Sequence, residues 1–462
     1  MLIRADYAAL VDAKNTVVRK ALIAIDEAGV VVGVHQSGDV DIPPYRARTV
    51  VELGADSLLI PGLINAHTHS AMTLMRGFGD DMKLMDWLVE RIWPAETLCV
   101  SPEYVADGTK LAVDEMLRSG TTTFSDMYFF PADVERVAHE MGMRSVVGQV
   151  VIGFPTPFAS GSDECLSRAE EALEKKAASV TDPAALVAAQ DLVTYSVAPH
   201  APYSVSEAHM SACIDLARRY KVPFTTHLHE CFEEIRASVE LDRTSGFCHQ
   251  CAHKCRPLAN LARIDLLDSS CVFAHMTQLE ADEIELIARK GCHVVHCPSS
   301  NMKLASGFCQ VAKLLAAGVN VALGTDGAAS NNSLDMLAEM KLAALLGKGV
   351  AGDPTAVSAH TALRMATING ARALGLDAIV GSIEVGKRAD FVALDLSKYG
   401  CSPVYDPVST LVYSAHRDCV THVWVNGKLL IERGQPTYGP LGVDVNRWRD
   451  RVAAVKKELD TV

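Results

Sequence analysis

The stretch Pro61-Gly-Leu-Ile-Asn-Ala-His-Thr-His69 decides the fold, because an apolar run rich in β-branched residues leads into a His-x-His pair. Three later segments have the same form, and they read Thr226-His227-Leu-His229-Glu230, Phe273-Ala-His275 and Gly324-Thr-Asp326-Gly327. If the apolar runs are parallel strands, their carboxyl ends meet at one mouth and bring the polar groups together. Imidazole and carboxylate groups in such a cluster indicate a metal site.

Extended runs alternate with helical patterns eight times along the chain. The expected strands lie near 58–64, 121–126, 144–152, 193–199, 223–228, 271–275, 293–297 and 319–325. Between them, segments such as 103–117 carry apolar residues at helical spacing, and Gly120 would end that helix. This alternation predicts an α/β fold, a (β/α)8 TIM-like barrel.

Both ends of the chain are strand-like and are expected to form one small domain. Leu22-Ile-Ala-Ile lies near the start, and residues 390–395 and 422–430 lie near the end, with a hairpin turn expected at Asn426-Gly427. We therefore predict a β-sandwich built from both termini, residues 1–57 and 378–462. The second part also contains a C-terminal helix, and residues 58–377 form the barrel.

Composition narrows the range of partners. The chain has 462 residues, 49% of them hydrophobic, and a formal net charge of -13, which disfavours binding to nucleic acid or an anionic membrane. A small-molecule substrate is expected instead. The N-terminus carries charges where a signal peptide needs an apolar core, and the 13 cysteines fit reduced thiols, so we expect a cytoplasmic protein.

Over essentially its whole length the chain resembles the metal-dependent amidohydrolase superfamily, and within it the 5'-methylthioadenosine/S-adenosylhomocysteine deaminases. The matching blocks are those quoted above together with Asp86-Trp-Leu, Trp93-Pro-Ala-Glu96, Gly120-Thr-Thr-Thr, Pro199-His-Ala-Pro-Tyr-Ser204, His275-Met-Thr-Gln278, His296-Cys-Pro-Ser-Ser-Asn-Met-Lys-Leu-Ala-Ser306, Gly324-Thr-Asp-Gly-Ala-Ala-Ser-Asn-Asn332 and Gly381-Ser-Ile-Glu-Val-Gly-Lys-Arg-Ala-Asp390.

The resemblance implies one Zn²⁺ per subunit held by His67, His69, His227 and Asp326. A water activated by this metal is the implied nucleophile. The end of the fourth expected strand carries His200, where two-metal branches of the superfamily would have a Lys. This difference indicates a single metal ion.

Roles for the remaining site residues follow from the same resemblance. Glu230 is the implied proton shuttle, His275 orients the water, and Asp326 serves as both ligand and base. Glu230 and Asp326 would also contact the substrate. The implied activity is zinc-dependent hydrolytic deamination of an adenine ring, which gives the inosine analogue and ammonia.

Three further residues are expected to bind a nucleoside. Glu96 would accept hydrogen bonds from the ribose hydroxyls, His200 would contact the substrate, and Trp87 would supply an apolar wall. For Trp87, ordinary core packing explains the residue type equally well.

The chain departs from the family's pattern in two places. Some members that take S-adenosylhomocysteine place an Arg after the third strand, but residues 151–158 here contain Phe and Pro and no basic residue. We therefore expect 5'-methylthioadenosine as the preferred substrate, ahead of S-adenosylhomocysteine or adenosine. The other departure is the Cys248, Cys251 and Cys255 cluster, which is read either as a second, structural metal site or as a reduced surface loop.

Alternative interpretations remain at this point. The same metal site would suit a hydrolase of another amino- or chloro-substituted azaheterocycle, such as a triazine or a guanine-like base. A non-catalytic scaffold on this fold would instead have lost metal ligands, whereas all four are present. We also expect a homo-oligomer and a lid around residues 80–83.

Overall fold

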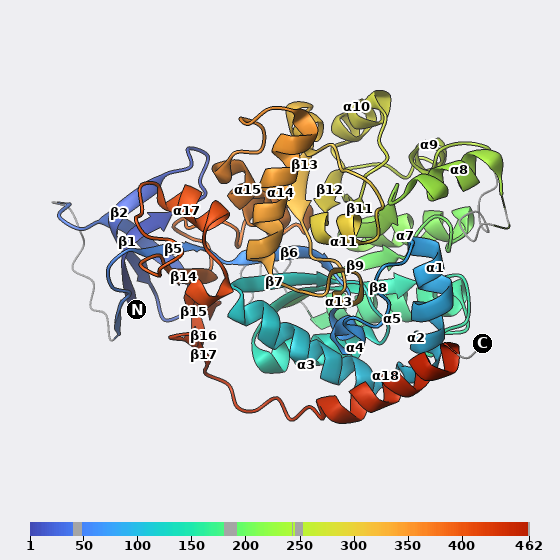
Figure 1. Cartoon of the computed structure of the whole chain (residues 1–462), viewed down its shortest axis with the longest axis horizontal. Coiled ribbons are helices and arrows are strands. Elements are labelled where there is room, and N and C mark those ends of the chain that lie inside the picture. The colour runs from blue at the N-terminus through green and yellow to red at the C-terminus, as the bar shows by residue number, and fades with distance from the viewer. Residues whose placement is uncertain (40–48, 180–191, 243, 245–252, 461–462) are drawn as a thin grey trace.

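A parallel eight-stranded barrel forms the centre of the computed structural model, which describes residues 1–39, 49–179, 192–242, 244 and 253–460 (Figure 1). Its strands in order are β6 (Leu63–Thr68), β7 (Thr121–Asp126), β8 (Arg144–Val151), β9 (Val193–Pro199), β10 (Phe224–Leu228), β11 (Cys271–His275), β12 (His293–His296) and β13 (Asn320–Leu323). Next to the last strand, the Asp326 N–H donates to the His67 carbonyl at 3.0 Å, which joins the two ends of the sheet. The predicted TIM-like barrel is confirmed.

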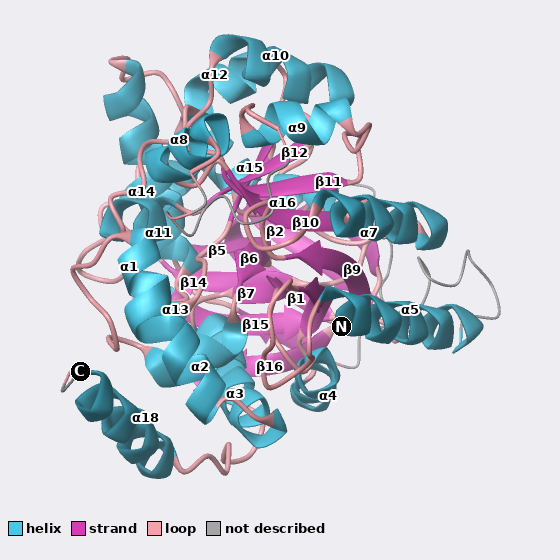
Figure 2. Ribbon diagram, turned by 90° about the vertical axis from the view of Figure 1, so that its right-hand side faces the viewer, coloured by secondary structure: helices cyan, strands magenta, loops and turns pink. Residues whose placement is uncertain are grey.

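Helices surround the barrel strands (Figure 2). Around the barrel and its mouth these elements are η1 (Ser70–Met75), α1 (Leu84–Trp87), η2 (Leu88–Ile92), α2 (Trp93–Cys99), α3 (Pro102–Arg118), α4 (Pro131–Met141), α5 (Ser162–Ser179), α7 (Glu207–Tyr220), α8 (Phe232–Glu240), α9 (Pro257–Arg263), α10 (Ala281–Lys290), α11 (Pro298–Lys303), α12 (Val311–Ala316), α13 (Ala328–Asn331), α14 (Met336–Ala351), α15 (Ala359–Met365) and α16 (Ile368–Ala373). The helix predicted over 103–117 is α3, whose start is capped by the Ser101 hydroxyl accepting from the Tyr104 N–H. None of the described helices combines the length and apolarity needed to cross a bilayer.

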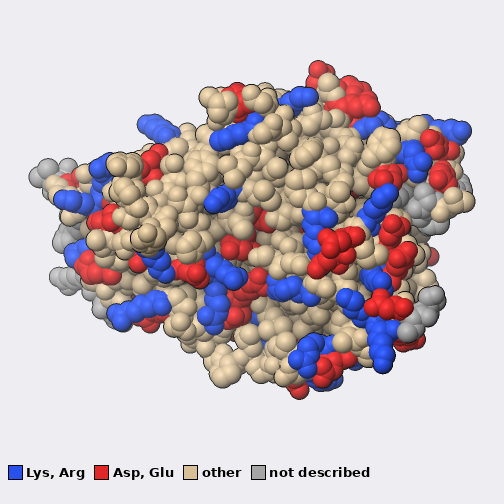
Figure 3. All heavy atoms as spheres, viewed as in Figure 1, with Lys and Arg blue, Asp and Glu red and all other residues tan. Residues whose placement is uncertain are grey.

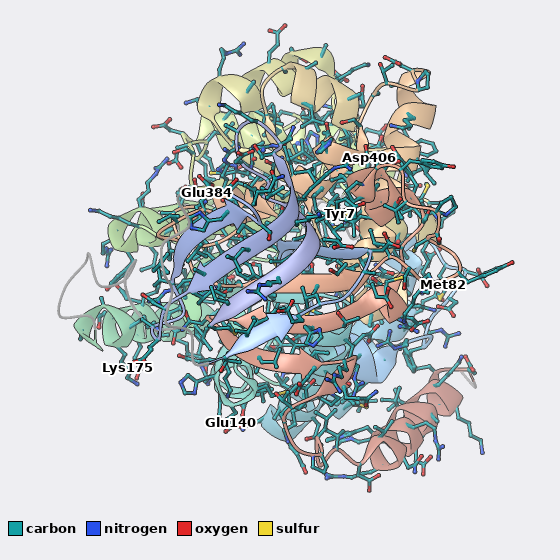
Figure 4. All side chains as sticks on the ribbon, turned by 90° about the vertical axis from the view of Figure 1, so that its left-hand side faces the viewer. Tyr7, Met82, Glu140, Lys175, Glu384 and Asp406 are labelled. Carbon is teal, nitrogen blue, oxygen red and sulfur yellow. The ribbon has the colours of Figure 1, made fainter. Side chains whose placement is uncertain are left out.

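Both termini contribute to a second, nine-stranded sheet, as predicted (Figure 4). Its strands are β1 (Leu2–Ala9), β2 (Val17–Ile25), β3 (Val31–Gln36), β4 (Val50–Glu52), β5 (Ser57–Pro61), β14 (Phe391–Asp395), β15 (Val420–Val425), β16 (Lys428–Glu432) and β17 (Gln435–Pro436). The expected hairpin turn joins β15 to β16, where Asn426 and Gly427 have φ of 52° and 78°. Two successive positive φ angles suit an Asn-Gly turn. The exact limits of the domains stay a prediction.

The strand expected over 58–64 is corrected by the structure. This apolar run is divided: β5 pairs with β1 and β14 in the terminal sheet, and the barrel strand β6 starts only at Leu63. The chain changes sheets at Gly62, whose N–H donates to the Asp390 carbonyl. A Cβ at Gly62 would lie 1.9 Å from the Thr122 Oγ1, so only glycine fits at this crossing.

After the terminal sheet, which also carries α17 (Pro407–Tyr413) and η3 (Arg417–Cys419), the chain returns to the barrel as α18 (Val445–Leu459). Figure 1 shows this red helix lying beside α2 and α3. The Trp448 side chain is fully buried there, with its Nε1 donating to Asp107 at 2.9 Å and its ring 5.3 Å from that of Tyr104. The C-terminal helix is therefore part of the barrel's outer layer.

Candidate active site

Four side chains meet at the carboxyl ends of the barrel strands. His67 lies on β6 and His227 on β10, His69 follows β6, and Asp326 lies just beyond β13. One ligand atom from each residue lies within 4.8 Å of all the others. The structure therefore brings together the four residues predicted as metal ligands.

Backbone carbonyls hold two of the imidazole rings. His69 Nδ1 lies 2.6 Å from the Met127 carbonyl oxygen, and His227 Nδ1 lies 2.7 Å from the His200 carbonyl oxygen. A carbonyl accepts only from a protonated nitrogen, so in the neutral form of each ring the unprotonated nitrogen is Nε2. The two Nε2 atoms lie 3.3 Å apart. This is the tautomer that a metal ligand requires.

The two carboxylate oxygens of Asp326 have different surroundings. Oδ2 accepts from the Ser300 hydroxyl at 2.7 Å and from the Ser330 hydroxyl at 2.8 Å. Oδ1 lies 3.1 Å from His69 Nε2. Burial alone would raise the pKa of Asp326, but the neighbouring His67 and His69 rings hold it well below its usual range. Asp326 is thus an anion with one oxygen left for a ligand.

The residues fit a metal ion of the zinc type. Among the residues that the structure describes, buried His67 Nε2 and Asp326 Oδ1 lack a hydrogen-bond partner, although both are strongly polar. Three imidazole nitrogens and one carboxylate oxygen are ligands of borderline ions such as Zn²⁺, and a three- or four-ligand set can leave a position for water.

Glu230 and His275 lie beside the ligands, as predicted. Both side chains are buried, and His275 Nε2 is 3.8 Å from Glu230 Oε2. Burial raises the pKa of Glu230 from its ordinary value. Glu230 is fixed through its backbone, since its N–H donates to Glu234 at 2.7 Å and its carbonyl accepts from the Thr277 hydroxyl at 2.7 Å.

Two of these residues have strained backbones. The φ angle is 74° at His275 and 60° at Asp326, in the left-handed region that residues other than glycine rarely adopt. Such strain costs on the order of 1–3 kcal/mol per residue and persists where the surrounding structure enforces it, commonly at active sites. The strain marks the same end of the barrel as the metal ligands.

A cavity beside the four ligands is lined by all five residues predicted to contact substrate, which are Glu96, Trp87, His200, Glu230 and Asp326. Burial raises the pKa of Glu96 to about 7. Burial also lowers the pKa of His200 to about 3, so its ring is neutral, and its Nδ1 lies 2.7 Å from the Ser204 hydroxyl. The cavity therefore combines an apolar wall with a few polar groups, as small-molecule sites do.

A second cavity shares Trp93, Glu96 and Tyr203 with the first and extends outward along residues 153–157. Phe154 and two prolines of this segment line it. No Lys or Arg occurs among the described residues that line either cavity. Phe158 is not among the residues that line this cavity; its ring packs against that of Phe130, with the ring centroids 5.5 Å apart.

Several supporting residues could not be assigned from the sequence. Ser300, Ser330, Glu234 and Asn301 act on the site residues through tertiary hydrogen bonds. The available signal was that Ser300 and Asn301 lie in the block His296 to Ser306, and Ser330 in the block Gly324 to Asn332. Both blocks match the family, but the match suggested no role for these three residues.

Two predictions near the mouth remain open. Cys248 and Cys251 lie outside the described residues, so the cysteine cluster has no described geometry; Cys255 is partly buried, with its Sγ 3.7 Å from Asn260 Oδ1. In the segment expected to form a lid, Asp80 forms a 2.5 Å ion pair with Lys303. That contact joins the segment to α11.

The comparisons with known proteins agree with this geometry. The model of the amidohydrolase family matches residues 58–430. The 5-methylthioadenosine/S-adenosylhomocysteine deaminase of Teredinibacter turnerae is 43% identical over 437 residues, which cover 94% of this chain and 92% of that protein. A crystal structure of an adenosine deaminase from Xanthomonas campestris with bound zinc is 42% identical, covers 98% of both chains and superposes with a TM-score of 0.90.

A more distant structure shares the fold alone. The atrazine chlorohydrolase of Arthrobacter aurescens complexed with zinc is 22% identical and covers 98% of this chain and 99% of its own, with a TM-score of 0.81.

The barrel, its metal cluster and the family match define the class: the chain belongs to the amidohydrolase family, and it is a metal-dependent hydrolase acting on carbon–nitrogen bonds of cyclic amidines. Within that family, its identity to the relatives just described places it in the 5'-methylthioadenosine/S-adenosylhomocysteine deaminase family. Its reaction is a hydrolytic deamination.

Proposed function

We propose that the protein deaminates the adenine ring of 5'-methylthioadenosine hydrolytically, using one Zn²⁺ bound by His67, His69, His227 and Asp326. Water replaces the exocyclic amino group, and the products are the inosine analogue and ammonia. The observation that carries this proposal is a ligand cluster that adjoins both a buried carboxyl group of raised pKa and a largely apolar cavity.

The cluster prepares the nucleophile. A bound Zn²⁺ would supply a water that loses its proton near neutral pH. Asp326, an anion with two serine hydroxyls on Oδ2, accepts a proton from the attacking water and passes it to the leaving amine. His275 holds the water in line with the ring carbon, since its Nε2 faces the cavity beside Glu230.

Glu230 delivers the second proton. Its raised pKa keeps a proton on the carboxyl group closer to neutral pH than an exposed Glu would. It gives this proton to the ring nitrogen next to the attacked carbon, which removes negative charge from the ring as the new carbon–oxygen bond forms. When ammonia leaves and the carbon–oxygen bond becomes a carbonyl, the remaining hydroxyl proton returns to Glu230. The position fixed by Glu234 and Thr277 keeps the carboxyl group in reach of that nitrogen.

The two cavities bind the rest of the substrate. Glu96 accepts from the ribose hydroxyls, His200 contacts the nucleoside and Trp87 forms an apolar wall of the cavity. The outer cavity, lined by Phe154 and Pro155, receives the 5'-methylthio group. S-adenosylhomocysteine carries a carboxylate at its far end, and the described cavity residues offer no cation for it.

The remaining partners are part of the same proposal. We propose a cytoplasmic homo-oligomer that binds a small nucleoside and neither nucleic acid nor membrane. The net charge of -13 disfavours binding to nucleic acid or an anionic membrane, and the face in Figure 3, where Lys and Arg are interspersed with Asp and Glu, agrees with this.

The test follows ammonia release and the ultraviolet change from adenine to hypoxanthine, with zinc-loaded protein and 5'-methylthioadenosine. Glu230→Gln keeps the shape of the side chain but removes the transferable proton, and we expect kcat to fall by about 10²–10⁴-fold. Adenosine and S-adenosylhomocysteine are compared by kcat/KM. A zinc-loaded wild-type protein that turns over none of these nucleosides would refute the proposal and favour another azaheterocycle.

A further inference from the structure

Asn301 lies on α11, and the mechanism above gives this residue no role. Its side chain is 2% exposed, and its Oδ1 lies 2.9 Å from His275 Nδ1. The next residue toward the N-terminus, Ser300, contacts Asp326. The short helix α11 therefore contacts two residues of the site, His275 and Asp326.

The direction of this hydrogen bond determines what His275 can do. A carbonyl oxygen accepts, so Asn301 Oδ1 requires the proton of a neutral His275 ring to be on Nδ1. Nε2 then carries the lone pair, and this atom lies 3.8 Å from Glu230 Oε2 beside the cavity. In this state His275 accepts a hydrogen bond from a water in the site.

The Asn301 side chain also borders a second, small cavity. Asn301 and His296 are both among the residues that line it, and none of the four predicted metal ligands is. Among the described residues, Asn301 Nδ2 and His296 Nδ1 are both buried without a hydrogen-bond partner. Of the two polar atoms of the Asn301 amide, Oδ1 therefore has a partner in His275, whereas Nδ2 has none among the described residues.

His275 needs such a partner because its backbone is strained. With φ at 74°, the residue is in the left-handed region, where its ring direction is not set by an ordinary strand geometry. The backbone is held nearby by the Thr277 N–H, which donates to the His229 carbonyl at 2.9 Å. The ring itself is held by the amide.

We propose that Asn301 is a positioning residue that fixes the ring orientation and the tautomer of His275 through its carbonyl oxygen. The proposal rests on the proposed function for the role of His275, but the geometry it predicts is independent of the substrate.

The kinetic test compares two substitutions in the zinc-loaded enzyme. Asn301→Leu removes the acceptor, and we expect kcat to fall by about 10- to 100-fold, the range typical of residues that orient catalytic groups, with KM within about twofold of the wild type. Asn301→Asp keeps the acceptor, and we expect it to recover most of the lost kcat. A normal kcat in Asn301→Leu, a change confined to KM, or equal damage from Leu and Asp would each overturn the proposal.

A matched control separates positioning from simple loss of a buried amide. Asn369 is also buried, and its Nδ2 donates to the Val321 carbonyl at 2.9 Å, away from the candidate catalytic residues. We expect Asn369→Leu to lower the melting temperature without the tenfold loss of kcat. An equal loss of kcat in this control would mean that general destabilisation explains both variants.

Two measurements need no substrate and so distinguish this proposal from the proposed function. Zinc affinity, measured by competition with a chelator, is expected to stay within about threefold in Asn301→Leu, since His275 is not a ligand in this scheme. A crystal structure of zinc-loaded Asn301→Leu is expected to show the His275 ring rotated. An unchanged ring, or a loss of zinc affinity as large as the loss of kcat, would contradict a positioning role.

Discussion

Three carboxyl groups in one small site have pKa values shifted in different directions because their surroundings differ. Asp326 is kept ionised by the His67 and His69 rings, whereas burial raises the pKa of Glu230 and raises that of Glu96 to about 7. Groups whose pKa values are pushed apart can act as base, acid and hydrogen-bond acceptor at one pH. These differences support the separate roles proposed for the three residues.

The pKa of Glu96 predicts a pH dependence of substrate binding. The ionised carboxylate accepts hydrogen bonds from both ribose hydroxyls, and this form is lost as the pH falls through about 7. We therefore expect KM for 5'-methylthioadenosine to rise as the pH is lowered below that value and to level off above it. Initial rates measured between about pH 5.5 and 8.5 check this.

Glu96→Gln serves as the control for this pH dependence. The amide does not titrate, so KM should be high at every pH and the slope should disappear. A wild-type KM that stays constant over the same range would show that ionisation of Glu96 does not govern binding.

At the scale of elements, strands were more predictable from sequence than their supporting contacts. The runs at 121–126, 193–199 and 271–275 match the observed strands, because an isolated apolar run between turns has few alternatives. The run at 58–64 does not match a single observed strand, because its hydrophobic residues continue from the terminal sheet into the barrel. Only the packing around Gly62 shows where the chain passes from one sheet to the other. The ligands were predictable because they end strands, whereas Asn301 and Ser300 act through contacts that exist only after folding.

The C-terminal helix supports the element that carries Glu96. Trp448 on α18 is fully buried against the barrel, and the Arg451 guanidinium donates to the Leu98 carbonyl of α2 at 2.8 Å. We expect Trp448→Ala to lower the free energy of unfolding by about 3–5 kcal/mol and to raise KM more than it lowers kcat, since α2 would shift. Thermal unfolding and steady-state kinetics measure the two effects.

Arg449 on the same helix offers a comparison. It is exposed, and among the described residues its ion-pair partner is its neighbour Asp450, so Arg449→Ala should change stability by no more than about 0.5 kcal/mol. If Trp448→Ala left both stability and KM at the level of this control, α18 would have no role in holding α2.

At the scale of the whole molecule, a buried ion pair joins the barrel to the terminal sheet. Arg144 at the start of β8 donates to both oxygens of Asp390, at 2.8 and 3.1 Å, and both side chains are almost completely buried. The Asn426 N–H donates to the same carboxylate at 2.7 Å. The pair therefore ties a barrel strand to the hairpin of the other sheet.

Breaking this pair should be costly for the whole fold. We expect Asp390→Ala to lower the free energy of unfolding by about 3–5 kcal/mol, because it leaves a buried guanidinium without its partner. The double variant Arg144→Leu with Asp390→Leu should lose less free energy of unfolding than either single Leu variant. Urea unfolding measures each, and Arg136→Ala, at an exposed ion pair on α4, is the control. Additive losses in the double variant would argue against coupling.

A hydrogen bond between the first and last barrel strands' ends links the first and last of the predicted metal ligands. The Thr68 hydroxyl donates to the Asp326 carbonyl at 2.9 Å, across a sequence separation of 258 residues. During synthesis, a ribosome releases His67 and His69 long before the aspartate exists. The nascent chain can therefore acquire its full ligand set only after the eighth barrel strand has emerged, so binding of a metal by all four ligands requires that every barrel strand has been made.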